Sequence, residues 1–170
     1  EMSRGLGDVY KRQLLETMLL DIIDNQTNPT VATYAKTSCS EVRITAKADS
    51  FEKAQNLVKP IAEEVIKRLG DNVYSTDEKE NIEDALVRLL RKNNLTISVA
   101  ESCTGGLTCS KIVNVGGASE VFKYGFITYA NEAKMKLLGV SKDTLEKYTA
   151  VSEKTAREMA CGAITVSYTH

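Results

Sequence analysis

Apolar residues follow two different periods along the first part of the chain. They recur every three or four positions in residues 14–23, which predicts an amphipathic helix. Residues 41–48 alternate polar and apolar side chains, as in a strand with one buried face, and residues 31–34 form a shorter extended segment. An apolar stripe along residues 54–69 predicts a second helix. Together these elements indicate a small α+β module.

The second part of the chain alternates helix and strand patterns. Residues 95–100 form an apolar run typical of a buried strand, and residues 122–129 have the pattern of a second strand. Helices are expected at residues 82–90, 107–115, 131–138, 141–148 and 152–163. This order predicts an α/β domain. Its sheet is expected to be incomplete, because a typical sheet has about four to six strands.

Three of the helix starts carry side chains suited to capping. Asp49 with Glu52 resembles a capping box at the start of the second helix. Ser75 and Glu78, or their neighbours in this polar stretch, can cap the next helix, and Asn131 can cap the helix after the second strand. These residues predict where the three helices begin.

Composition and charge exclude several classes of function. The chain has 170 residues and a net charge of −1, with 22 basic and 23 acidic residues interspersed along it. Long-range attraction to nucleic acid or to a membrane surface is therefore not expected. No apolar run reaches the roughly 20 residues that span a bilayer, and a cytoplasmic location is expected. The four cysteines contain no Cys-x-x-Cys pair, so we expect reduced thiols and no metal site.

The chain has a single histidine, His170, at its last position. A Ser-His-Asp or Cys-His site is therefore not expected. Any nucleophile in this protein has to be activated by a lysine, a carboxylate, a tyrosine or a helix terminus.

The stretch SVAESCTGG places an acid, a hydroxyl and a thiol where the first α/β strand ends and a helix begins. Ligands of open α/β sheets bind at this end of the strands. Gly105 and Gly106 would let a ligand approach the backbone, and free N–H groups at the helix start would favour an anion such as phosphate. An equally good interpretation is a tight turn capped by Ser102 or Thr104.

A second cluster, residues 128–134, follows the other strand of the α/β domain. Lys134 is the candidate base, since a desolvated amine can take the proton of a serine hydroxyl. The alternatives are an exposed helix lysine and, for Tyr129, an aromatic ring at the edge of the core. Ser102 and Cys103 both remain candidate nucleophiles, because periodicity does not decide which of them faces a ligand. Cys109 and Cys161 have the spacing of core residues.

The phrases AESCTGG and YGFITYANEAKMKLLGVSKDTLEKYTAVSEKTAREMACGA resemble the CinA family of competence- and damage-inducible proteins. Upstream, LLETMLLDIIDNQTNPTVATYAK and EVRITAKA resemble the KH-type linker domain of full-length members. The resemblance implies a leader unlike the family at residues 1–13, a KH-type α+β domain at 14–76 and a deamidase domain at 77–170. That last domain would be an incomplete three-layer α/β amidohydrolase domain.

The resemblance implies hydrolysis of the carboxamide of nicotinamide mononucleotide to nicotinate mononucleotide and ammonia, with no metal or cofactor. Ser102 is then the nucleophile, Lys134 its general base and Tyr129 part of the proton network. The implied substrate-binding residues are Glu101, Thr104, Gly105, Gly106, Thr128 and Asn131. Full-length members are expected to form homodimers.

Some features depart from the family pattern. Members continue past Ala163 into another strand and a glycine-rich loop, so the domain is expected to be truncated at its C-terminus. The end sequences EMSRGLGDVYKRQ and VSYTH do not continue the pattern, and we interpret them as foreign sequence. No two glycines have the Gly-x-x-Gly spacing by which KH domains grip nucleic acid, so the KH-type module is interpreted as a spacer. The alternative function is a non-catalytic interaction or dimerisation fragment.

Overall fold

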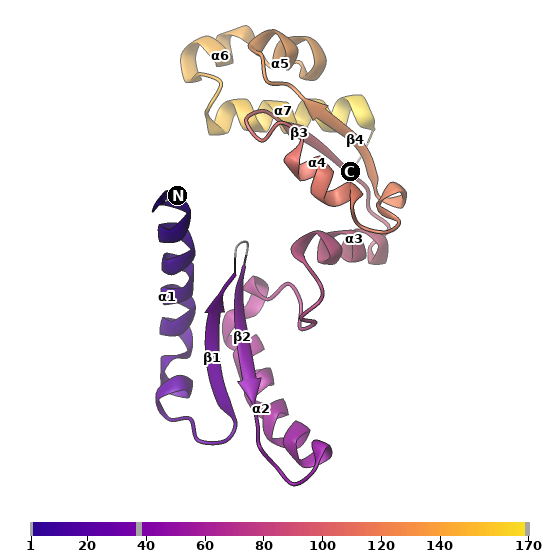
Figure 1. Ribbon diagram of the computed structural model, residues 1–170. Coiled ribbons are helices and arrows are strands. Elements are labelled where there is room, and N and C mark those ends of the chain that lie inside the picture. Colours follow the sequence, from indigo (N-terminus) through magenta and orange to yellow (C-terminus); the bar gives the residue numbers. More distant parts are fainter. Residues whose placement is uncertain (1, 37–38, 169–170) are drawn as a thin grey trace. The chain divides into compact units, whose positions relative to one another are not determined.

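The computed structural model describes residues 2–36 and 39–168, with side chains from residue 12 onward. The chain forms two compact units, Glu1–Tyr74 and Ser75–His170. Each unit has its own helices and its own two-stranded sheet (Figure 1). Each also has its own buried apolar residues.

The first unit is a β-hairpin packed on two helices. Strands β1 (Thr30–Ala35) and β2 (Ser40–Thr45) pair antiparallel. Helix α1 (Met2–Asp24) precedes the hairpin, and α2 (Phe51–Leu69) follows it and ends in the 3₁₀ turn η1 (Gly70–Asn72). The α+β module that periodicity predicts is therefore confirmed.

The core of the first unit lies between the helices and one face of the hairpin. Leu19 of α1 and Val65 and Leu69 of α2 are buried, and Val42 and Ile44 of β2 pack against them. Val42 and Ile44 are two positions apart, so the alternating pattern in the sequence marks this buried face.

The second unit begins with helix α3 and is built on two parallel strands. The strands are β3 (Ile97–Glu101) and β4 (Phe122–Ile127), with Glu101 opposite Ile127. The helices are α3 (Ile82–Lys92), α4 (Leu107–Val113), α5 (Asn131–Leu138), α6 (Lys142–Tyr148) and α7 (Glu153–Ser167), with the 3₁₀ turn η2 (Ala118–Glu120) before β4. Every helix and strand that the pattern predicts in this unit is present, with ends shifted by a few residues.

Both faces of the parallel pair are covered. Val99 of β3 packs into a cluster built by α3, α4 and η2, in which Val87 and Ile112 are buried. The next residue, Ala100, packs into a second cluster that contains Met159 of α7. Successive strand residues point to opposite faces, so the unit has three layers (Figure 1). The predicted mixed α/β architecture is confirmed.

The residues that cap three helices differ from the predicted ones, although α3 and α5 begin at the predicted residues 82 and 131. Helix α2 is capped by Ser50 rather than Asp49, and Ser50 Oγ accepts the Lys53 N–H at 3.3 Å. The capping box of α3 is formed by Asn81 and Asp84, not by Ser75. Helix α5 has its N-cap at Ala130, so that Asn131 is already the first helical residue. In each case the cap lies one to six residues from the predicted position. Before α2 and α3 several polar residues can cap and tertiary packing selects one, whereas the N-cap of α5 is an alanine without a side-chain bond.

Candidate active site

Ser102 and Lys134 come from two different strand–helix junctions and meet at one edge of the sheet. Ser102 follows the last residue of β3, and Lys134 lies one turn into α5, after β4. Because β3 and β4 are parallel, their carboxyl ends lie side by side. Lys134 Nζ is 3.1 Å from Ser102 Oγ, which is hydrogen-bonding distance.

The Lys134 side chain is completely buried, with 0% of its surface exposed. Its Nζ donates hydrogen bonds to the backbone carbonyls of Thr128 at 2.7 Å and Tyr129 at 2.8 Å. Both carbonyls belong to the short link between β4 and α5. The interpretation of Lys134 as an exposed helix lysine is therefore wrong.

The Lys134 amine has three oxygen neighbours. Its Nζ donates to Ser102 Oγ and to the carbonyls of Thr128 and Tyr129, which can only accept. In its neutral form a lysine amine has two N–H groups, which the two carbonyls can accept, and one lone pair, which can accept the Ser102 hydroxyl proton. Among the described residues no carboxylate forms an ion pair with Lys134. The arrangement can thus draw a proton from Ser102.

Glu101 caps helix α4 from inside the fold. Its side chain is buried, with 4% exposed. Oε2 accepts the N–H groups of Gly106 and Thr108, each at 3.1 Å, and Oε1 accepts the N–H of Cys109 at 2.8 Å. A carboxylate at this place satisfies donors that a helix start otherwise leaves without partners.

The predicted anion site at the start of α4 is therefore wrong. Three of its N–H groups are bound to Glu101, and the Leu107 N–H donates to the Thr104 carbonyl at 3.0 Å. Capping of α4 by Ser102 or Thr104 at the helix N-cap is wrong as well, because Gly106 occupies the N-cap without a side-chain bond. The turn interpretation holds, with Glu101 as the capping group.

Glycine is needed in the turn between β3 and α4. Gly105 has φ +58° and Gly106 has φ +100°, which side chains disfavour. A Cβ at Gly106 would also lie 2.9 Å from Ile127 Cδ1. The two glycines thus allow the chain to turn sharply between Ser102 and α4.

Burial and hydrogen bonding act in opposite directions on Glu101. Burial alone would raise the pKa of Glu101, but hydrogen bonds from the Cys109 thiol, the Thr104 hydroxyl and the Cys109 and Thr108 N–H groups outweigh it and lower this pKa from 4.5 to about 2. Burial and the Glu101 carboxylate raise the pKa of the Cys109 thiol to about 11. Cys109 thus stays protonated at neutral pH and donates to Glu101.

Glu101 should make the stability of the fold depend on acid pH. Its folded-state pKa lies below the ordinary value of 4.5, so its stabilisation is present above about pH 4.5 and is lost as pH falls toward 2. The difference in unfolding free energy between the wild type and Glu101→Gln is expected to be largest near pH 7 and to shrink by pH 3. Urea unfolding at both pH values measures it, and an equal difference at the two contradicts this role.

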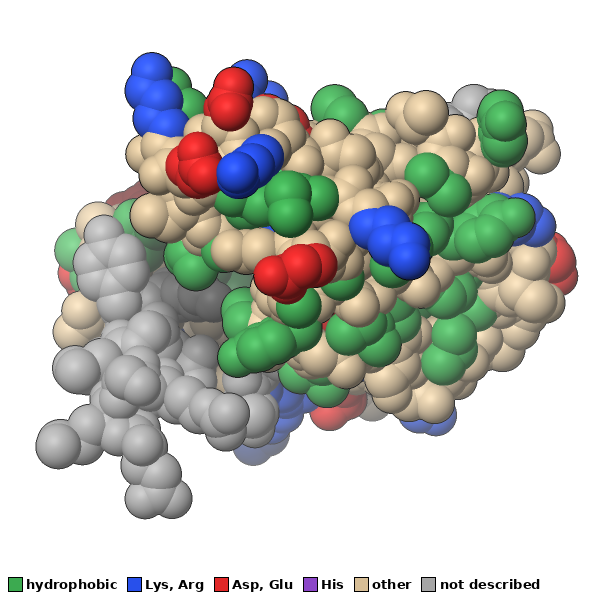
Figure 2. All heavy atoms as spheres, turned by 90° about the horizontal axis from the view of Figure 1, so that it is seen from above, with side chains coloured by type: hydrophobic (Ala, Val, Ile, Leu, Met, Phe, Trp, Pro, Cys, Tyr) green, Lys and Arg blue, Asp and Glu red, His purple; other side chains and the backbone are tan. Residues whose placement is uncertain are grey.

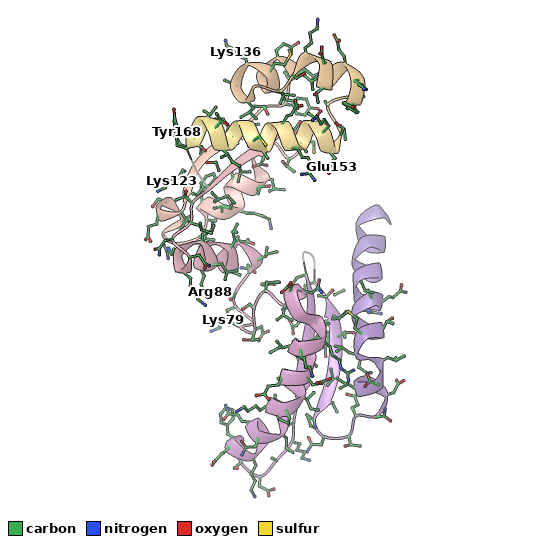
Figure 3. All side chains as sticks on the ribbon, turned by 180° about the vertical axis from the view of Figure 1, so that it is seen from behind. Lys79, Arg88, Lys123, Lys136, Glu153 and Tyr168 are labelled. Carbon is green, nitrogen blue, oxygen red and sulfur yellow. The ribbon has the colours of Figure 1, made fainter. Side chains whose placement is uncertain are left out.

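A cavity of about 690 Å³ lies between β3 and α7, and Ser102 and Cys103 line it. Figure 3 labels Glu153 and Tyr168 at the two ends of α7, whose length forms one wall. The other lining residues are Thr96, Ile97, Ser98, Ala100, Ala150, Val151, Ser152, Glu153, Ala156, Met159, Ala160, Ala163 and Ile164. The candidate nucleophile therefore opens onto a mostly apolar space.

The structure places the remaining predicted site residues outside this cavity's lining. Glu101 and Thr128 are buried, and the Thr128 N–H donates to the Glu101 carbonyl at 2.9 Å. Thr104, Gly105 and Asn131 are exposed and Gly106 is half-buried, but none of them lines the cavity. The Tyr129 side chain is 75% exposed, so it is not a core-edge aromatic. Tyr129 reaches Lys134 through its backbone carbonyl.

The thiols have different environments from those that the pattern predicts. Cys103 is exposed and lines the cavity, but the Lys134 amine bonds to Ser102. Cys161 is exposed and Cys109 is half-buried beside Glu101, so neither is a fully buried core residue. The hydroxyl rather than the Cys103 thiol is therefore the group beside the base.

The wall formed by α7 and by the loop before it was not identified from the sequence. Ala156, Ala160 and Ala163 face the cavity from α7. Small residues at a spacing of three and four indicate a helix face that another group approaches closely, and this was the available signal. The pattern does not say whether that group is another helix or a ligand.

Two further features concern metals and membranes. Within residues 2–36 and 39–168, no group of three or more His, Cys, Asp or Glu side chains is placed to hold a metal ion. In the same part of the chain, none of the helices combines the length and the apolar character needed to cross a membrane.

Two sequence-family models match the chain. The model of the CinA C-terminal domain matches residues 79–170. The model of the damage-inducible protein CinA KH domain matches residues 14–75.

Curated relatives match over most of this chain. A CinA-like protein of Kosmotoga olearia is 54% identical over 158 residues, which cover 93% of this chain and 37% of that protein. A competence-damage inducible protein of Clostridium beijerinckii is 57% identical over 142 residues, which cover 84% of this chain and 34% of that protein. The chain thus spans about a third of the length of these relatives.

Solved structures are similar to part of this chain. A competence/damage inducible protein from Agrobacterium tumefaciens is 40% identical, with a TM-score of 0.50, over 51% of this chain and 53% of that one. A competence-damaged protein (CinA) superfamily protein from Escherichia coli is 38% identical, with a TM-score of 0.52, over 59% of this chain and 61% of that one.

Proposed function

The chain belongs to the CinA family, and on that premise we propose that it hydrolyses the carboxamide of nicotinamide mononucleotide to nicotinate mononucleotide and ammonia. One observation carries the proposal: the buried Lys134 amine lies 3.1 Å from Ser102 Oγ, and two carbonyls accept its other hydrogen bonds. This is the geometry of a serine nucleophile with a lysine base.

In the proposed first half-reaction, Ser102 Oγ attacks the carboxamide carbon while its proton passes to the Lys134 amine. The carbonyl oxygen takes up the negative charge of the tetrahedral intermediate. The Cys103 N–H, which follows the nucleophile directly, has no hydrogen-bond partner among the described residues and is a candidate donor to that oxygen. The carbon–nitrogen bond then breaks, the leaving nitrogen takes the proton from Lys134, and ammonia departs.

In the proposed second half-reaction, water attacks the Ser102 ester. Its proton passes to the Lys134 amine as the new carbon–oxygen bond forms. The bond to Ser102 Oγ then breaks, and Lys134 returns the proton to that oxygen. Nicotinate mononucleotide leaves, and both side chains regain their starting protonation states.

The cavity supports the flat carboxamide-bearing ring of the proposed substrate. Its volume of about 690 Å³ is in the range of small-molecule sites, about 300–1,000 Å³. Ile97, Ala100 and Met159 offer apolar contacts to a heteroaromatic ring, and Ser102 lines the same space. The carboxamide of a pyridine ring would then lie within reach of the nucleophile.

For the first unit we propose a spacer role without nucleic-acid binding. The chain has no Gly-x-x-Gly loop, and its net charge is −1. Figure 2, which looks down on the α5 and α6 end of the view in Figure 1, shows acidic and basic side chains interspersed on that face as well. Such a surface does not favour a phosphate backbone.

Ammonia release from nicotinamide mononucleotide by the whole chain tests the proposed function. We expect ammonia and nicotinate mononucleotide in equal amounts, with much slower release from free nicotinamide and from glutamine. A coupled glutamate dehydrogenase assay measures ammonia, and chromatography identifies the other product. A chain that is folded by circular dichroism and releases no ammonia from the mononucleotide would favour a non-catalytic interaction fragment instead.

A further inference from the structure

Glu101 connects three segments around the candidate nucleophile. Its backbone carbonyl accepts the Thr128 N–H at 2.9 Å, which joins the ends of β3 and β4. Its carboxylate accepts the N–H groups of Gly106, Thr108 and Cys109 at 2.8–3.1 Å, which joins the end of β3 to α4. The residue directly before the nucleophile is therefore bonded to both elements that flank the site.

The base is attached to the same network. The Thr128 carbonyl accepts the Lys134 amine at 2.7 Å, while the Thr128 N–H bonds to Glu101. Ser102 is covalently joined to Glu101 and lies 3.1 Å from Lys134. These bonds form a closed ring in which Glu101 is the member that also holds the turn.

We propose that Glu101 is the positioning residue of the Ser102–Lys134 pair. Its carboxylate ties the turn at residues 102–106 to α4 and so keeps Ser102 Oγ at hydrogen-bonding distance from Lys134 Nζ. The inference rests on the proposed role of Ser102 as nucleophile. Glu101 is not among the residues that line the cavity, so its action is on the nucleophile and not on the substrate.

Besides the bonds to Glu101, two short-range backbone bonds hold the turn: the Gly105 N–H donates to the Ser102 carbonyl at 3.1 Å, and the Leu107 N–H donates to the Thr104 carbonyl at 3.0 Å. Gly105 and Gly106 contribute no side chains, and Cys103 and Thr104 are exposed. Losing the carboxylate would leave the N–H groups of Gly106, Thr108 and Cys109 without their acceptor and would let Ser102 move relative to Lys134. A displacement of about 1 Å between reacting groups can cost on the order of 100-fold in rate.

Glu101→Gln tests the inference in the whole chain. The amide keeps the shape of the side chain, but its NH₂ group cannot accept hydrogen bonds from the backbone N–H groups that the carboxylate binds. We expect kcat for ammonia release to fall on the order of 100-fold, with KM within about twofold of the wild type. Glu101→Asp keeps the charge but shortens the side chain by one methylene, and the same pattern is expected. If Glu101→Asp has the kcat of the wild type while Glu101→Gln does not, the charge of the side chain matters and its length does not, which would overturn the proposal.

Glu158→Gln is the matched control. Glu158 is also a helix-capping carboxylate of this unit, and it accepts the Ser141 N–H at 2.9 Å and the Thr144 hydroxyl at 2.7 Å. It does not line the cavity. We expect this variant to keep the kcat of the wild type, so an equal loss in both variants would mean a general stability effect and would overturn the proposal.

A second measurement separates this inference from the proposed substrate. Diisopropyl fluorophosphate phosphorylates an activated serine with loss of fluoride, and mass spectrometry locates the product. We expect Ser102 to be modified on the order of 100-fold more slowly in Glu101→Gln than in the wild type and in Glu158→Gln. If nicotinamide mononucleotide is not hydrolysed but this difference is seen, the proposed substrate is wrong and the positioning role stands. Equal labelling rates, or no labelling of Ser102 in the wild type, overturn the role.

Discussion

Replacing Ser102 by alanine is expected to lower the rate of amide hydrolysis by a factor on the order of 10⁴ to 10⁶ while the protein stays folded. The side chain is half-buried and supplies the only hydroxyl bonded to the Lys134 amine among the described residues. Its loss removes the proposed nucleophile without removing any buried apolar volume. Ammonia release measures the rate, and circular dichroism checks the fold.

Cys103→Ala is the matched control for Ser102→Ala. Cys103 is the neighbouring residue and lines the same cavity, but the lysine amine bonds to Ser102. We expect activity within a few-fold of the wild type for Cys103→Ala. Activity that survives in Ser102→Ala and disappears in Cys103→Ala would identify the thiol as the nucleophile.

The effects of replacing Ser102 and Lys134 should not add. Adding Lys134→Met to Ser102→Ala is expected to cost little further activity, because nucleophile and base act in the same step. Lys134→Met alone is harder to interpret, since it also leaves the carbonyls of Thr128 and Tyr129 without their donor.

Replacing Gly162 by alanine is expected to destabilise the second unit by about 3 kcal/mol, although alanine in a helix interior usually gains about 0.5–1 kcal/mol over glycine. A Cβ at Gly162 of α7 would lie 2.0 Å from the Leu138 carbonyl oxygen and 2.7 Å from its carbon. These are backbone atoms at the end of α5, and Leu138 is buried against Met159 and Ala163. Helices α5 and α7 would have to separate, which opens the cluster.

Gly116→Ala is the control for Gly162→Ala. A Cβ at Gly116 would meet no atom within 4 Å, and this glycine does not have a positive φ. Thermal unfolding followed by circular dichroism is expected to show a drop on the order of 10 °C for Gly162→Ala and little change for Gly116→Ala. Equal melting temperatures for the two variants would show that α5 and α7 can move apart at little cost.

Much of the fold could be predicted from the sequence because its signals are local. The alternation in residues 41–48 marks the buried face of β2, and the apolar run at 95–100 marks β3. The order of strands and helices placed Ser102 after one strand of the α/β unit and Lys134 after the other. Parallel pairing of β3 with β4 then places them 3.1 Å apart.

The helix caps could not be predicted to the residue. Every loop before a helix offers several polar side chains, and the sequence does not rank Ser50 above Asp49 or Asn81 above Ser75. For α4 the capping group is Glu101, five to eight residues before the N–H groups that it binds. Such a contact depends on the path of the turn, which sequence spacing does not describe.

The sequence by itself determined the two modules, the order of their elements and the two junctions that hold a hydroxyl and an amine, because periodicity and turn residues act over a few positions. Only the tertiary structure decided that Lys134 faces Ser102 and not Cys103, and that Glu101 binds the start of α4 where an anion site was expected. Those outcomes depend on the strand register and on the pairing of polar groups inside the fold. A buried donor or acceptor without a hydrogen bond costs free energy, so these groups pair with whichever partner the fold brings within hydrogen-bonding distance.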